Sequence, residues 1–252
     1  FRYDYLIIAL GAQTADYGIP GVREYSCQFK TLDDAVMVSE KVSQLFHELE
    51  QGTRQAPIRV CVVGAGFSGV ELVAEMALYG RKMSAQYNLS SRPFMPYLFE
   101  AGPKIVPMVS DDERAAIRTQ LTKLGVIITE NATIESLDDM HLKLKSGHKF
   151  SSDVTVWTAG IGANQFLRSI NGLELTNAGK LIVGSDMLLS GRTNVFGVGD
   201  NVEFTDHETQ KPIPSLAYIA VEHGRVAAEN IIRSIKGQKL AEHKPFYELW
   251  VA

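Results

Sequence analysis

Residues 60–76 read VCVVGAGFSGVELVAEM. They place a G-x-G-x-x-G turn between a strand-like apolar run and a segment with helical spacing of apolar residues. The β-branched run 58–63 before the turn is typical of a buried parallel strand. After the turn, apolar residues recur at helical spacing as far as Ala77. This order predicts a strand, a tight turn and a helix that hold the pyrophosphate of a dinucleotide.

Each residue type in the turn suits a separate task. Gly64 permits the sharp strand-to-helix turn, and Gly66 lets a pyrophosphate approach the backbone. Gly69 lets the helix pack closely on the strand, and Phe67 lies between the second and third glycines. The free N–H groups and dipole of the helix N-terminus favour phosphate, so we expect these four residues to bind the cofactor.

A second strand is predicted at residues 96–100 and ends in Glu100. An acid at this place bonds the ribose hydroxyls and repels a 2′-phosphate, which favours NAD(H) over NADP(H). The gap from the glycine turn exceeds the usual roughly 20 residues. The polar segment 84–93 is therefore expected to be an inserted loop.

The rest of this region continues the pattern of a nucleotide-binding domain. A capping box at Ser110–Glu113 opens a helix that Gly125 ends, and residues 140–150 alternate as a hairpin does. The strand 153–157 ends in small residues, which leaves room for a cofactor to lie across it. Residues 31–158 are thus predicted to form one dinucleotide-binding domain.

Composition excludes several function classes. The chain has 252 residues, 45% apolar content and a net charge of −4, which disfavours a nucleic-acid partner. Its longest apolar stretches are too short to span a bilayer. Cys27 and Cys61 stand far apart without a CxxC, so we expect no disulfide framework and no metal site. The chain opens inside a predicted strand without an initiating Met, and we expect a piece of a longer protein.

The flanks carry further motifs but no complete sheet. A strand at 3–9 runs into Gly11, a strand at 195–198 ends in Gly199-Asp200, and a helical pattern covers 214–235. With the nucleotide domain, these motifs resemble the two-dinucleotide-binding-domain flavoproteins of the pyridine nucleotide-disulfide oxidoreductase superfamily. Within it, the chain is most similar to the type II NADH dehydrogenases. The resemblance is carried by YDYLIIALG (3–11), GIPG (18–21), KTLDDA (30–35), GAGFSGVEL (64–72), WTAG (157–160) and GD (199–200).

The resemblance implies an α/β fold in which a Rossmann-like NAD-binding domain is inserted into a partial FAD-binding domain. Residues 1–30 and 159–236 would belong to the FAD domain, 31–158 to the NAD(H) domain, and 237–252 to the start of a C-terminal region. The implied site residues divide between two cofactors. Ala159 and Gly160 would border NADH, while FAD would be bound by Leu10, Gly11, Gly199 and Asp200, the last through its ribitol.

Glu71 has two interpretations. The resemblance implies a glutamate near the nicotinamide and flavin rings, which makes Glu71 the candidate catalytic residue. Alternatively, a Glu in the first turn of a helix is favoured simply by the helix dipole.

Three features depart from the family pattern. The opening strand with the FAD fingerprint is absent, and so is the C-terminal region that docks on the membrane. The quinone segment of the family reads A-Q-x-A-x-Q, but residues 217–222 read AYIAVE. The neighbouring His223 is expected to pack its ring against the sheet rather than to act in catalysis.

The expected function is an FAD-dependent NADH:acceptor oxidoreductase, in which hydride passes from NADH to FAD and electrons pass on to an acceptor such as a quinone. The alternatives are an isolated NADH-binding module without turnover, another FAD-dependent pyridine nucleotide oxidoreductase, or an interaction protein that kept only the fold. We expect the flanking segments to favour a homodimer. We expect a cytoplasmic location, with the full-length protein peripheral on the cytoplasmic membrane face.

Overall fold

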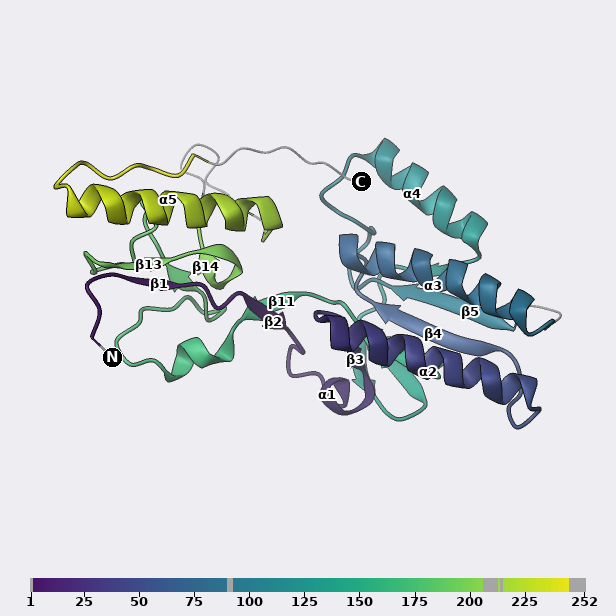
Figure 1. Cartoon of the computed structure of the whole chain (residues 1–252). Coiled ribbons are helices and arrows are strands. Elements are labelled where there is room, and N and C mark those ends of the chain that lie inside the picture. The colour runs from purple at the N-terminus through teal and green to yellow at the C-terminus, as the bar shows by residue number, and fades with distance from the viewer. Residues whose placement is uncertain (1, 90–92, 206–212, 214, 245–252) are drawn as a thin grey trace. The chain divides into compact units, whose positions relative to one another are not determined.

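The computed structural model describes residues 2–89, 93–205, 213 and 215–244. The chain divides into two compact units (Figure 1). The nucleotide unit is Thr14–Gly160, and the flanking unit combines Phe1–Gln13 with Ile161–Ala252. The nucleotide unit contains the short strand β3 (Cys27–Gln28).

A five-stranded parallel sheet forms the centre of the nucleotide unit, in the order β3-β10-β4-β5-β6. Its strand β4 lies in the middle and is almost completely buried, as the β-branched sequence predicts. The expected α/β fold with a Rossmann-like sheet is confirmed. Besides β3, the strands are β4 (Ile58–Val63), β5 (Phe94–Phe99), β6 (Ile127–Thr129) and β10 (Val154–Trp157).

Helices cover one face of this sheet. They are α2 (Leu32–Glu50), α3 (Phe67–Gln86) and α4 (Asp111–Leu124). The short α1 (Val22–Tyr25) packs its Val22 in the cluster on the other face of the sheet. Capping boxes start α2 and α4, and Gly125 ends α4 in the left-handed conformation, as predicted for α4. The apolar faces of the three long helices meet the sheet in one core around residues such as Phe46, Val73 and Leu121.

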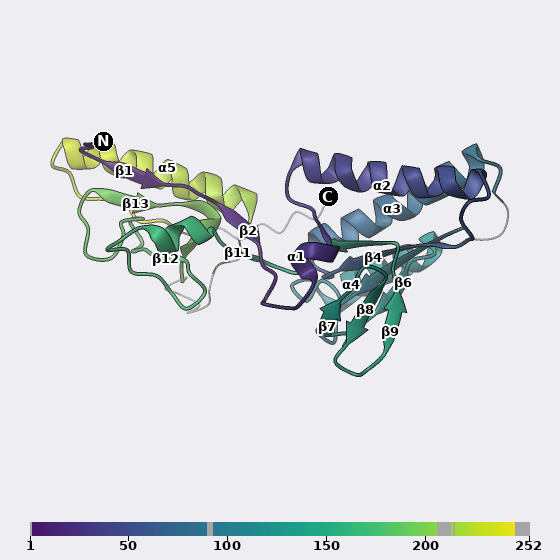
Figure 2. The same ribbon diagram turned by 90° about the horizontal axis from the view of Figure 1, so that it is seen from below.

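The opposite face of the sheet is covered by a small antiparallel sheet (Figure 2). Its strands are β7 (Ile134–Leu137), β8 (His141–Leu144) and β9 (Lys149–Ser151), and the predicted hairpin is β8–β9. Leu142 packs in one cluster with Cys61 and Trp157 from the parallel sheet. Cys61 is therefore a core residue, as expected, and burial raises the pKa of its thiol to about 12.

The inserted loop is shorter than expected. Helix α3 continues through Gln86, so the first part of the polar segment 84–93 is helical. Residues 90–92 lie outside the described residues.

The flanking unit contains short paired strands and one long helix. Strand β1 (Leu6–Ile8) pairs in parallel with β13 (Val195–Gly197), and residue Leu188 bridges to the other side of β13. The helix α5 (Ala217–Ile235) packs Val226 and Ala227 against Phe196 of β13. The remaining elements are β2 (Ala12–Thr14), β11 (Ile161–Ala163), η1 (Gln165–Ser169), β12 (Leu181–Ile182), η2 (Gly199–Asn201) and β14 (Val202–Glu203).

None of the helices within the described ranges has the length and apolar content that crossing a membrane requires. Residues 214 and 245–252, which were expected to belong to the long helix and to the C-terminal region, lie outside those ranges.

Candidate nucleotide-binding site

The glycine turn between β4 and α3 has no room for side chains at two of its positions. Gly64 adopts a φ of +103°, and a Cβ there would lie 2.5 Å from the Ala159 Cα atom. A Cβ on Gly69 would lie 1.8 Å from the Gly64 carbonyl oxygen. The turn and the close helix–strand packing therefore require glycine at both places, as the sequence predicts.

Gly66 is different, because space is open in front of it. Among the described residues, and apart from Gly66 itself and its immediate chain neighbours, no heavy atom lies within 4 Å of the position a Cβ would take. Gly66 is also the N-cap of α3, and being glycine it supplies no side-chain capping bond to this helix N-terminus. Open space beside free backbone N–H groups at the positive end of a helix dipole fits a pyrophosphate.

Glu100 lies directly beside this turn, although 35 residues separate it from Ala65. Its Oε2 atom accepts the Ala65 N–H at 2.8 Å, and its Oε1 atom accepts the Gly102 N–H at 2.7 Å. The two bonds orient the half-buried carboxylate at the carboxyl end of β5. The acid expected to bind the ribose is thus held next to the turn expected to bind the phosphates.

The residues that follow β10 lie beside the glycine turn and form a third part of the site, after the turn itself and Glu100. The Thr158 hydroxyl donates to the carbonyl oxygens of Val63 and Gly64 at 2.9 Å each, which ties the two strand ends together. Ala159 follows beside Gly64, so the structure brings the expected border residue to the turn. Parallel strands β4, β5 and β10 therefore present their carboxyl ends at one edge, where nucleotides bind in such sheets.

Tyr17 is a residue of this region that the sequence interpretation missed. A Cβ on Gly160 would lie 1.9 Å from the Tyr17 hydroxyl oxygen, so the tyrosine lies against that glycine. Tyr17 is 67% exposed as a residue, and its φ is +52°. No local pattern could have signalled it, because its position depends on the distant strand end.

Glu71 occupies an exposed position on α3, beyond the first turn. The first turn of α3 contains no acidic residue, so the interpretation of Glu71 as a first-turn dipole partner is wrong. Dipole stabilisation decays within that turn. The catalytic interpretation remains a proposal.

The residues expected to bind FAD form a separate cluster in the flanking unit. The Gly11 N–H donates to the Asn201 Oδ1 atom at 3.3 Å, and the Asn201 Nδ2 group donates to the Ile8 carbonyl at 3.1 Å. Fully buried Asn201, which the sequence interpretation missed, thereby joins the end of β1 to the turn that holds Gly199 and half-buried Asp200. Leu10 joins the same group, since its carbonyl accepts the Asn164 side-chain amide at 3.4 Å.

This cluster fits part of a flavin site. A Cβ on Gly11, whose φ is +64°, would meet no atom within 4 Å, which leaves room for a bound group to approach the backbone. Asp200 supplies a carboxylate that can accept hydrogen bonds from ribitol hydroxyls.

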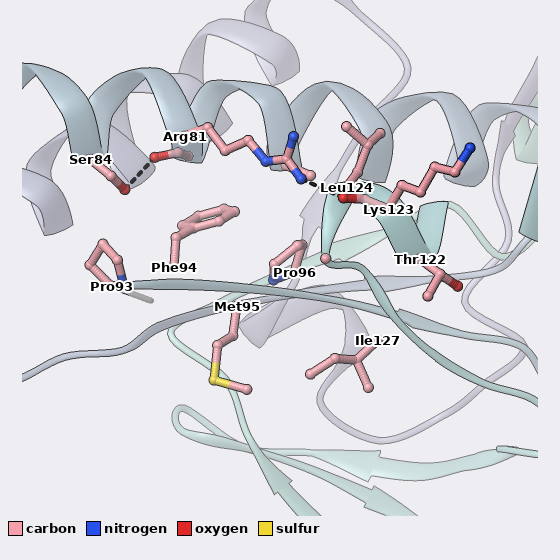
Figure 3. Close-up of a pocket in the computed structure, with 13 residues that line it drawn as sticks. Arg81, Ser84, Pro93, Phe94, Met95, Pro96, Thr122, Lys123, Leu124 and Ile127 are labelled. Atoms are coloured by element: carbon pink, nitrogen blue, oxygen red, sulfur yellow. Dashed lines mark hydrogen bonds between the residues drawn. The ribbon is translucent and has the colours of Figure 1, made fainter. Parts of the chain in front are cut away.

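A hollow of about 520 Å³ on the nucleotide unit lies elsewhere (Figure 3). It is beside Phe94 and Pro96 at the amino end of β5, where Arg81 donates to the Lys123 carbonyl at 2.6 Å. Strand β6 pairs with β5 from Tyr97 onward. The hollow lies beside the earlier residues of β5, which β6 does not reach. Since Glu100 follows the opposite end of β5, the hollow is separate from the nucleotide site.

Taken together, the turn, the acid and the strand ends define a dinucleotide-binding unit of the Rossmann type. A family model for pyridine nucleotide-disulphide oxidoreductases matches residues 1–224, and the chain belongs to that family.

Relatives agree with the resemblance to type II NADH dehydrogenases. The chain is 23% identical over 249 residues to a type II NADH:quinone oxidoreductase of Staphylococcus haemolyticus, with 94% of this chain and 60% of the relative covered. It is 28% identical over 252 residues to a demethylphylloquinone reductase of Synechocystis sp., with 98% of this chain and 58% of the relative covered. The chain thus spans about three fifths of the length of these relatives.

The fold also matches a solved structure, that of NDH2 from Plasmodium falciparum in complex with NADH. The TM-score is 0.72 and the identity 24%, with 81% of this chain and 44% of that chain covered. The expectation that NAD(H) and FAD are the cofactors of this class is confirmed by the family and by the NADH:quinone oxidoreductases among its relatives.

Proposed function

We propose that the protein carrying this chain is an NADH:acceptor oxidoreductase that uses FAD. The observation that carries the proposal is the Glu100 carboxylate held beside an uncapped, open glycine turn. The N–H groups of this turn bind the pyrophosphate of NADH, and Glu100 accepts hydrogen bonds from the adenosine ribose. FAD, when bound, supplies the hydride acceptor and passes electrons onward.

The roles of the remaining residues follow from the same proposal. Ala159 and Gly160 border the dinucleotide at the end of β10. Leu10, Gly11, Gly199 and Asp200 bind the flavin from the flanking unit, with Asp200 orienting the ribitol. Glu71 is proposed to act near the nicotinamide and flavin rings.

We propose a quinone as the electron acceptor. The names of the relatives support it, and cysteine chemistry has no support in the described residues. Both cysteines are free and buried, and the raised pKa of Cys61 keeps its thiol protonated and unreactive. The departure of residues 217–222 from the family's quinone segment predicts a different quinone preference.

The decisive assay is NADH oxidation by the intact protein with a soluble quinone, compared with a disulfide substrate. We expect turnover with the quinone and none with the disulfide. Reduction of the disulfide instead would contradict the proposal. Binding of NADH without any flavin absorbance would favour the second candidate, an NADH-binding module without turnover.

We propose that the flanking unit also favours a homodimer of this chain. Within the described ranges β1 pairs with β13 alone, and Ile7 on β1 is 38% exposed. A groove of about 290 Å³ lies along β1 and is lined by exposed Tyr3 and Phe166. An open strand edge with apolar surface invites pairing with another chain. Sizing of the purified chain tests this, and a monomer at high concentration would refute it.

For the intact protein, we propose a peripheral position on the cytoplasmic face of the membrane. The quinone oxidoreductases among the relatives support it, since quinones partition into lipid. Co-sedimentation with quinone-containing vesicles is the test.

A further inference from the structure

A buried histidine touches the turn that carries Asp200. His223 lies on α5 and is only 3% exposed. Its Nδ1 atom accepts the backbone N–H of Gly199 at 3.3 Å. Gly199 has a φ of +77° and starts the short η2 helix, so this bond acts at the point where β13 turns.

A second histidine covers the first. His243 comes from the segment after α5, and its backbone N–H donates to the Ser185 carbonyl at 2.6 Å. The two imidazole centroids are 4.7 Å apart with their planes at 87°. Phe204 meets the rings edge-on at 5.8 Å from His223 and 5.2 Å from His243. This aromatic cluster excludes water from the His223 ring.

The hydrogen bond determines the protonation state of His223. A neutral imidazole that accepts at Nδ1 must carry its proton on Nε2. That Nε2 atom is buried and finds no hydrogen-bond partner among the described residues, and the same holds for the Nε2 atom of His243. A buried N–H group without a hydrogen-bond partner costs folding free energy, so the burial of these two imidazole rings needs an explanation.

The surroundings of the ring keep it neutral. Burial, aided by the charge of His243, lowers the pKa of His223 to about 4. Burial also lowers the pKa of His243. The negative charge of Glu222 opposes this effect, and the positive charge of Arg225 adds to it. Asp200 is the charged group on the turn itself. A protonated His223 would present a donor to the Gly199 N–H and lose the bond.

We propose that His223 is a positioning residue for the flavin: its Nδ1 atom fixes the Gly199 N–H and thereby aims Asp200 at the ribitol, while His243 seals the contact from water. This inference rests on the proposed use of FAD. It gives His223 a role in positioning the cofactor, whereas the sequence predicted only that its ring packs against the sheet. The ring is buried, and its contacts are with Gly199, Phe204 and His243.

Two substitutions separate positioning from packing. In His223→Asn the Oδ1 atom replaces Nδ1 as acceptor, whereas His223→Leu fills similar space without an acceptor. Hydrogen exchange and NMR shifts of the Gly199 amide report on the bond without any flavin. We expect the amide to stay protected in His223→Asn and to lose protection in His223→Leu. Equal protection in both variants would overturn the inference.

The second measurement is the affinity of the intact protein for FAD. We expect His223→Leu to weaken it at least about tenfold and His223→Asn to change it less than about threefold, because one hydrogen bond differs. Unchanged FAD affinity in His223→Leu would overturn the positioning role. If the wild type binds no FAD, the proposed function fails, and the amide measurement still decides whether His223 holds the turn.

The role of His243 has its own test. His243→Ala admits water to the ring, so the pKa of His223 should rise toward 6.5, its ordinary value. Protection of the Gly199 amide should then be lost at mildly acidic pH, where the wild type keeps it. A pH profile identical to that of the wild type would contradict the sealing role.

Discussion

Two glycines of the same turn should respond in opposite ways to one added methyl group. Gly69→Ala places a Cβ 1.8 Å from the Gly64 carbonyl oxygen and 2.8 Å from the Thr158 hydroxyl oxygen. The first of these neighbours is backbone, so α3 must move away from β4. Gly66→Ala meets no atom within 4 Å, and its φ of −71° suits alanine.

The magnitudes follow from these contacts. Overpacking of this kind costs about 1–3 kcal/mol, and a contact with backbone places Gly69→Ala at about 3 kcal/mol. For a chain of this size that lowers Tm by about 6–12 °C. Gly66→Ala weakens the helix cap by at most about 1 kcal/mol. Its methyl group instead occupies the space expected for the pyrophosphate, and NADH affinity should fall at least about tenfold.

Thermal unfolding followed by circular dichroism measures the first effect, and calorimetric titration with NADH at a temperature where both variants are folded measures the second. The two variants serve as each other's control. The reasoning fails if Gly69→Ala melts with the wild type, or if Gly66→Ala binds NADH as tightly as the wild type.

The remaining predictions concern single side chains. Glu100→Ala should weaken NADH binding about tenfold and abolish any preference for NADH over NADPH, because a charge-assisted bond to the ribose is lost. Equal binding of NADH and NADPH by the wild type would contradict the assignment of Glu100 to the ribose. Glu71→Gln in the intact protein should slow flavin reduction in stopped-flow experiments and leave Tm unchanged. His223 has a pKa of about 6.5 in the unfolded state and about 4 in the folded state. Between these pH values the unfolded state binds more protons, so the free energy of unfolding should fall by up to about 3 kcal/mol as the pH drops from 6.5 to 4. Urea unfolding at the two ends of the window tests this, with His223→Asn expected to flatten the profile. Ser110→Ala should cost about 1 kcal/mol in the same assay, because it removes the α4 capping box.

Several distinctions in the site come from contacts that no local pattern signals. Tyr17 against Gly160 and Asn201 against the end of β1 both join segments more than a hundred residues apart. Strand β3 has only two residues, too few for periodicity, and it joins the sheet through its pairing with β10.

The sequence by itself determined the elements whose cause is local. The β4–turn–α3 unit, the capping box of α4, the Gly125 stop and the β8–β9 hairpin follow from spacing, glycine conformation and alternation within a few residues. Tertiary structure alone decided that Glu100 bonds the Ala65 N–H and that His223 is sealed by His243. The physical reason is that hydrogen bonding and burial depend on which distant groups share a location, and that location is set by the packing of the whole unit.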